Sequence, residues 1–153
     1  LVLLVQPLLI AVLLYVVADK EIFDIYESTK SMLFALSCSG IWIGLFNSIQ
    51  ETAKARDSKE RIYGKFEAAG YVISKFVLQA VLGFVQAWIL SFVFLKLIDK
   101  KRSGIFIENF NIEIFFTVWL TVLAAITMGF VISSMVKSGD KAMAIAPFVL
   151  IIQ

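Results

Sequence analysis

Charged residues divide the chain into long uncharged windows separated by short polar segments. The uncharged windows occupy residues 1–18, 31–50, 76–95 and 114–136, and a fifth begins at residue 142. A helix that rises about 1.5 Å per residue needs roughly 20 residues to cross about 30 Å of hydrocarbon. A helix also satisfies its own backbone hydrogen bonds where no water is available, so each window predicts a membrane crossing.

We therefore expect an all-α fold, a polytopic transmembrane helical bundle with four complete crossings and the start of a fifth. The expected crossings are about 1–18, 31–50, 69–96, 113–136 and 142–153. The third is the longest because uncharged residues also precede Lys75. The amine of that lysine can reach the headgroups while its stem stays in the apolar zone.

The composition agrees with a membrane protein and excludes two other classes. Hydrophobic residues make up 60% of the chain and charged residues only 17%, whereas soluble domains carry about a quarter charged residues. Too few polar faces remain to cover the apolar windows in water. The formal charge is only +2, and the basic residues interrupt apolar runs instead of forming a stripe, so no nucleic-acid partner is expected.

The residues that usually perform catalysis are nearly absent. The chain has no His, its one cysteine, Cys38, lies inside an apolar run, and no glycine-rich phosphate loop occurs. We therefore expect no catalytic residue, no metal site and no cofactor within this segment, which would not be an enzyme by itself. The missing initiator methionine and the apolar end at Gln153 further lead us to expect a piece of a longer protein.

The longest polar segment, residues 51–67, is expected to be helical. Arg56 and Glu60, and Asp57 and Arg61, are each four residues apart, the spacing at which opposite charges face each other on a helix. Apolar residues recur at three- to four-residue intervals on another face: Ile62, Tyr63, Phe66 and Ala69. Such a helix either lies solvated in a loop or docks on the membrane surface or into a groove of a partner.

The loops give a weak prediction of orientation. With alternating crossings, segments 51–67 and 137–141 share one side and, with Lys75, carry eight basic residues against six on the other side. Cytoplasmic loops carry the excess of Lys and Arg, so the count favours a cytoplasmic 51–67 segment. The basic cluster Lys96–Arg102 on the opposite side weighs against this assignment.

Two features of the second window bear on helix packing. Gly40 and Gly44 are four residues apart, a spacing that lets another helix approach closely. Trp42 there, and Trp88 in the third window, lie near the middle of their windows and away from the interfacial belt typical of Trp. They either pack between helices, which we favour, or line a cavity.

Several short motifs, taken in order, resemble the membrane domains of ATP-binding-cassette (ABC) transporters of the White/G type. The first three are GLFNSIQE at residues 44–51, KERI at 59–62 and YVISK at 71–75. The later ones are GFVISSM at 129–135, SGDKAM at 138–143 and PFVLIIQ at 147–153. Ala55 departs from the family, which often has a second acid near this position.

The resemblance implies that the chain is the permease domain of an ATP-driven exporter, with segment 51–67 as a cytoplasmic coupling helix. A separate nucleotide-binding domain, in the same chain or another subunit, would bind ATP and Mg²⁺, and a second membrane domain would complete a dimer. The protein would then be a multi-pass component of the plasma membrane or bacterial inner membrane, in contact with lipid and with a transported substrate that the sequence does not identify.

The resemblance also assigns roles to residues. The coupling residues expected to contact the nucleotide-binding domain are Glu51, Arg56, Glu60, Arg61, Ile62, Tyr63 and Phe66. Those expected to line the substrate path are Trp42, Phe46, Asn47 and Phe148. The alternative from the residues alone is a multi-pass scaffold that does not transport and whose polar helix recruits a cytosolic partner. An intramembrane enzyme would need catalytic groups from outside this segment.

Overall fold

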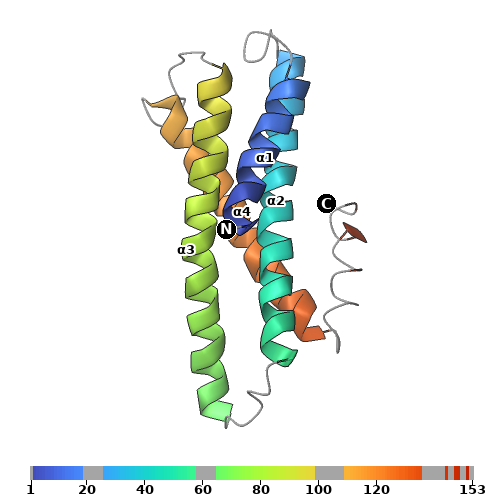
Figure 1. The fold of residues 1–153 in the computed structure, drawn as a ribbon, viewed down its shortest axis with the longest axis vertical. Helices are drawn as coiled ribbons and strands as arrows, with labels where there is room; N and C mark the ends of the chain where they lie inside the picture. The colour runs from blue at the N-terminus through green and yellow to red at the C-terminus, as the bar shows by residue number, and fades with distance from the viewer. Residues whose placement is uncertain are drawn as a thin grey trace. The chain divides into compact units, whose positions relative to one another are not determined.

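The structure is a computed structural model that describes residues 2–18, 26–57, 65–98 and 109–135, with single positions 144, 147, 148 and 151 near the end. Figure 1 shows its four labelled elements, which are all helices. They are α1 (Val2–Val17), α2 (Tyr26–Asp57), α3 (Lys65–Ile98) and α4 (Phe110–Met135). The prediction of an all-α chain is confirmed for these residues.

Three of the helices are long and apolar enough to cross a membrane. The candidate spans are Tyr26–Thr52 in α2, Val72–Ile98 in α3 and Phe110–Met135 in α4, and they coincide with the second, third and fourth predicted crossings. Helix α1 has 16 residues, or about 24 Å of length, which is shorter than the hydrocarbon layer. A crossing by α1 stays a prediction, and the fifth predicted crossing lies almost entirely outside the described residues.

Helix α2 is longer at both ends than the uncharged window that predicted it. It begins at Tyr26 and continues without a break beyond Gln50 to Asp57. The first seven residues of the predicted coupling segment therefore extend α2, and residues 65–67 begin α3. Residues 58–64 lie outside the described part, so a separate coupling helix stays a prediction.

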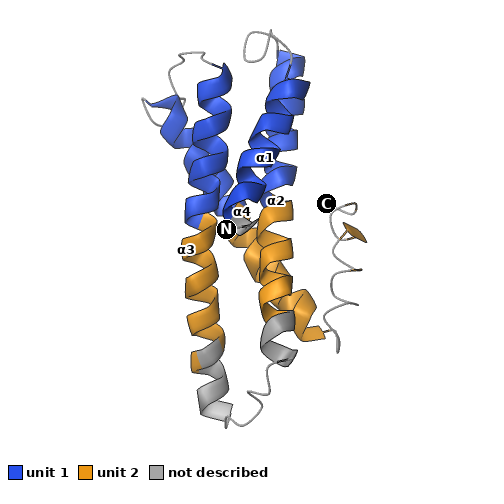
Figure 2. Ribbon diagram, in the orientation of Figure 1, with its two compact units in different colours: residues 1–40, 84–121 blue, residues 41–83, 122–153 orange. Residues whose placement is uncertain are grey.

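The chain divides into two compact units, which Figure 2 colours separately. Unit 1 comprises residues 1–40 and 84–121, and unit 2 comprises residues 41–83 and 122–153. Each unit thus contains parts of α2, α3 and α4, and unit 1 also contains α1.

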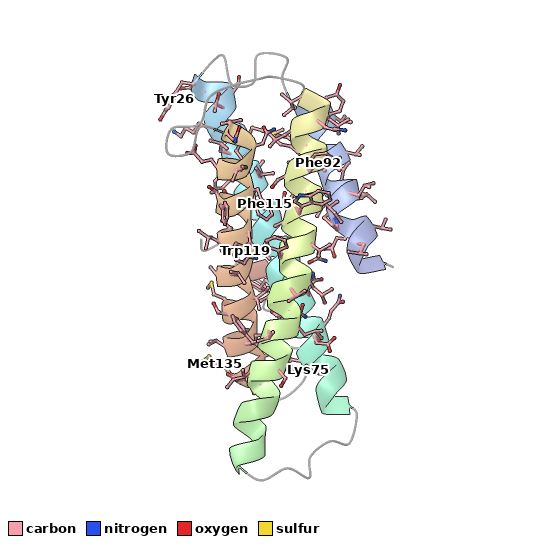
Figure 3. All side chains as sticks on the ribbon, turned by 90° about the vertical axis from the view of Figure 1, so that its left-hand side faces the viewer. Tyr26, Lys75, Phe92, Phe115, Trp119 and Met135 are labelled. Carbon is pink, nitrogen blue, oxygen red and sulfur yellow. The ribbon has the colours of Figure 1, made fainter. Side chains whose placement is uncertain are left out.

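In unit 1, apolar side chains from three helices are buried. Leu36 of α2, Leu90 and Phe94 of α3 and Val118 of α4 are nearly inaccessible. Phe84 of α3 also meets two rings of α4 edge to face, with ring centroids 5.1 Å from Phe115 and 5.4 Å from Trp119. Figure 3 labels both rings of α4. Edge-to-face aromatic pairs contribute about 0.5–1.5 kcal/mol beyond the area they bury.

In unit 2, the core lies between α2 and α4. Leu45 and Ile49 of α2 and Ala125 of α4 form a buried cluster. Partly buried side chains pack around it: Ile41, Phe46 and Ile132. The predicted coupling segment begins at residue 51, so this core packs the part of α2 just before that segment against α4.

Many large apolar side chains remain exposed outside these cores. On α1 they cover more than half of the helix circumference, with examples at Leu8, Leu13 and Val17. Water-soluble monomers rarely expose so much contiguous apolar surface. In a bilayer the same surface faces lipid tails at no cost, which agrees with the candidate spans.

Candidate functional site

An ion pair joins the end of α2 to the start of α3 in unit 2. The ammonium nitrogen Nζ of Lys75 lies 2.8 Å from Oε1 of Glu51, and both side chains are 30% exposed. Figure 3 labels Lys75 near the N-terminal part of α3. Because both groups remain partly accessible, screening limits the stabilisation by such a pair to about 1 kcal/mol or less. The ion pair therefore adds little to the stability of the fold, but it fixes the position of the end of α2 relative to α3.

A second polar contact joins the same helices one turn away. Nε2 of Gln79 donates a hydrogen bond of 2.9 Å to the backbone carbonyl of Asn47, and both residues are buried, with Asn47 only 6% exposed. Asn47 and Glu51 are four residues apart, as are Lys75 and Gln79, so both contacts join matching faces of two antiparallel helices. We call these four residues the α2–α3 joint.

The joint consists of a buried hydrogen bond, between Gln79 and Asn47, and a partly exposed ion pair, between Lys75 and Glu51. The Gln79 amide is directional and lies in a buried setting, where a polar group without a partner is costly. The ion pair of Glu51 and Lys75 is closer than this hydrogen bond to the C-terminal end of α2. Together they connect the end of α2 to the start of α3 at two levels, one turn apart.

Helix α4 approaches α2 closely on another side of unit 2. A Cβ atom placed on Gly44 would lie 2.6 Å from the carbonyl oxygen of Val122 and 2.8 Å from Cβ of Ala125. A Cβ atom on Gly129 would overlap Oγ of Ser48. Glycine at position 44 therefore permits a backbone approach that any side chain would prevent, whereas the atom nearest to the added Cβ at Gly129 belongs to a serine side chain.

The predicted coupling residues are described only in part. Glu51 lies in the α2–α3 joint. Arg56 and Phe66 lie in α2 and α3, but their side chains are outside the described part of the chain. The remaining four also lie outside it: Glu60, Arg61, Ile62 and Tyr63. No contact with a nucleotide-binding domain is tested, and these roles stay predictions.

The predicted path residues differ in exposure. Trp42 is 41% exposed and stacks on Phe46, with ring centroids 4.3 Å apart and planes at 26°. Phe148 is also exposed, whereas Asn47 is buried in the joint. Gly40, predicted with Gly44 to serve helix packing, is buried in unit 1.

Two glycines of unit 2 were not singled out as packing residues from the sequence. They are Gly83 and Gly129; a Cβ atom on Gly83 would lie 2.9 Å from Cγ1 of Val122. The sequence contains a signal for the joint. Asn47 and Glu51, four residues apart, lie at the end of the second apolar window, and Lys75 and Gln79, with the same spacing, lie at the start of the third. It contains no equivalent signal for the glycines, since an isolated glycine in a window does not reveal which helix it faces.

Within the described ranges, no group of three or more His, Cys, Asp or Glu side chains could hold a metal ion. A family model described as ABC-2 type transporter matches residues 1–153 of the chain. No curated protein and no solved structure gives a significant match.

Proposed function

We propose that this chain is a permease domain that exports a substrate when a nucleotide-binding domain hydrolyses ATP. The proposal rests on the family, because the chain belongs to the ABC-2 type transporter family. Membrane domains of this family generally act with ABC nucleotide-binding domains. ATP and Mg²⁺ would be bound there, and this chain would supply the substrate path. The order of motifs described from the sequence supports placement in the White/G type, with a second membrane domain completing a dimer in the cell membrane.

The α2–α3 joint is the observation that carries the coupling proposal. The proposed coupling segment, residues 51–67, begins within α2 and ends within α3. The contacts of Glu51 with Lys75 and of Gln79 with Asn47 connect these two helices. A displacement of the segment by a nucleotide-binding domain would therefore move both helices together and would not bend one of them alone.

We propose that this motion changes the surroundings of the stacked pair of Trp42 and Phe46. Trp42 lies on α2, about two and a half turns from Glu51, and its ring is partly exposed. Phe148 is a further exposed aromatic residue at the proposed path. We propose that both contact the transported substrate or the second membrane domain.

The test uses the complete transporter, with every Trp except Trp42 replaced by Phe. ATP with vanadate, which traps the motor after hydrolysis, should change the emission of Trp42. Glu51→Lys or Lys75→Glu alone places like charges at the joint and should reduce this change while ATP hydrolysis continues. The double variant restores opposite charges and should recover most of the response.

Lys30→Glu is the control, because it changes an exposed charge near the opposite end of α2. It should leave the Trp42 response intact. Unaltered responses in both single variants, or a double variant no better than either, would refute the role of the ion pair.

A further inference from the structure

Aromatic side chains and a lysine follow one another at four-residue intervals along the C-terminal half of α3. The aromatic residues are Phe84, Trp88 and Phe92, and the lysine is Lys96. Four residues advance a helix by about 6 Å and turn it by about 40°, so these side chains form a slowly winding stripe. Phe84, at one end, packs against Phe115 and Trp119 of α4.

Trp88 and Phe92, the next two aromatic residues of the stripe, are also exposed. Trp88 is 52% exposed and Phe92 is 45% exposed. Their rings stack with centroids 5.2 Å apart and an interplanar angle of only 8°. Together they form an apolar wall about one turn long.

Lys96 ends this wall with a positive charge. Its Nζ lies 5.0 Å from the centroid of the Phe92 ring, a distance at which a cation is attracted to the ring face. No described carboxylate forms an ion pair with Lys96. The ring draws the ammonium group back along the stripe, and a lysine has three N–H donors to offer to an anion.

The position of Lys96 along α3 corresponds to the level of lipid headgroups. Val72–Ile98 is a candidate membrane span of 27 residues, which is about 40 Å long and exceeds the hydrocarbon layer. Lys75 and Lys96 are about 32 Å apart along the helix axis and bracket its uncharged part. With both ammonium groups at the membrane boundaries, the stacked rings lie about 6–12 Å deeper, beside the acyl chains.

Charge complementarity selects the occupant. Residues 96–102 contain four basic residues and one acidic residue, so electrostatic attraction favours an anionic lipid headgroup over a zwitterionic one at this end of the span. The apolar wall suits an acyl chain, which a free anion lacks. We propose that Trp88, Phe92 and Lys96 bind an anionic phospholipid, with its phosphate on Lys96 and an acyl chain along the two rings.

Quenching by brominated lipid tests this proposal in the complete transporter, with Trp88 as its only Trp. The protein is reconstituted in equal mixtures of phosphatidylglycerol and phosphatidylcholine, with bromine on the acyl chains of one or the other. One basic residue near a membrane surface contributes about 1 kcal/mol, or about fivefold enrichment of anionic lipid. Brominated phosphatidylglycerol should therefore quench Trp88 more strongly than brominated phosphatidylcholine.

The variants separate the charge of Lys96 from the fold. Lys96→Gln should bring the two quenching efficiencies close together, Lys96→Arg should keep the preference, and Lys30→Gln should keep it as the matched control. Equal quenching by both lipids in the parent protein would overturn the proposal, as would an unchanged preference in Lys96→Gln. Absence of quenching by either lipid would also overturn it, because the stripe would then be covered by protein. None of these outcomes depends on coupling to ATP hydrolysis.

Discussion

Replacing Gly44 by Ala tests the close approach of α2 and α4. The added Cβ atom would lie 2.6 Å from the backbone oxygen of Val122, whereas ordinary contacts begin near 3.4 Å. Because the obstructing atom belongs to the backbone, no side-chain rotation relieves the contact. The helices must separate by about 0.8 Å, and a gap of this size loses a quarter to a half of the dispersion energy of the affected contacts.

The expected cost follows from the position of Gly44 beside the unit 2 core. Separation would loosen the cluster of Leu45, Ile49 and Ala125, and overpacking of this kind costs about 1–3 kcal/mol. For a domain of this size, such a cost lowers the melting temperature by several degrees. We expect this decrease in thermal unfolding of the purified transporter, followed by the fluorescence of its membrane domain.

Gly70→Ala provides the matched control. A Cβ atom on Gly70 would meet nothing within 4 Å, and Ala is the better helix former by about 1 kcal/mol. This variant should be as stable as the parent protein or more stable. If Gly44→Ala and Gly70→Ala melted at the same temperature, the proposed close packing of α2 and α4 would be wrong.

Two further predictions concern the second glycine contact and the coupling segment. Gly129→Ala should lower the melting temperature because its Cβ would overlap Oγ of Ser48. Ser48→Gly should lower the free energy of unfolding less in the Gly129→Ala variant than in the parent protein, with a coupling energy of about 1 kcal/mol in a double-mutant cycle. If the effects of the two substitutions were strictly additive, the contact between Gly129 and Ser48 would be contradicted. Exchanging the charges of Glu60 and Arg61 should leave insertion and ATP hydrolysis intact but reduce transport per ATP. An unchanged ratio, once a substrate is identified, would remove both residues from the proposed interface.

The membrane-spanning helices could be predicted from the sequence because their signal is local. An uncharged run of sufficient length must be helical in a bilayer, and α3 and α4 follow their windows closely. The ends of α2 were predicted less accurately, because a helix can extend into water and the polar residues Glu51–Asp57 continue α2 without being apolar. Charge therefore marks the boundary of the membrane, and it does not mark the end of a helix.

The contacts between helices could be predicted only in part. The spacing of Gly40 and Gly44 indicated a packing face, but the sequence did not show that Gly44 meets Val122. Lys75 was expected to extend towards headgroups, but the sequence did not show that its ammonium group pairs with Glu51. Such pairings depend on the rotation of each helix about its axis, and several rotations are compatible with the same hydropathy pattern.

The emission of Trp42 during ATP hydrolysis is the most direct measure of whether the α2–α3 joint transmits motion from a motor domain. We expect a change with ATP and vanadate that weakens in Glu51→Lys and in Lys75→Glu and returns when both are combined. Equal responses in the parent, both single variants and the double variant, at equal rates of ATP hydrolysis, would show that the joint does not transmit this motion.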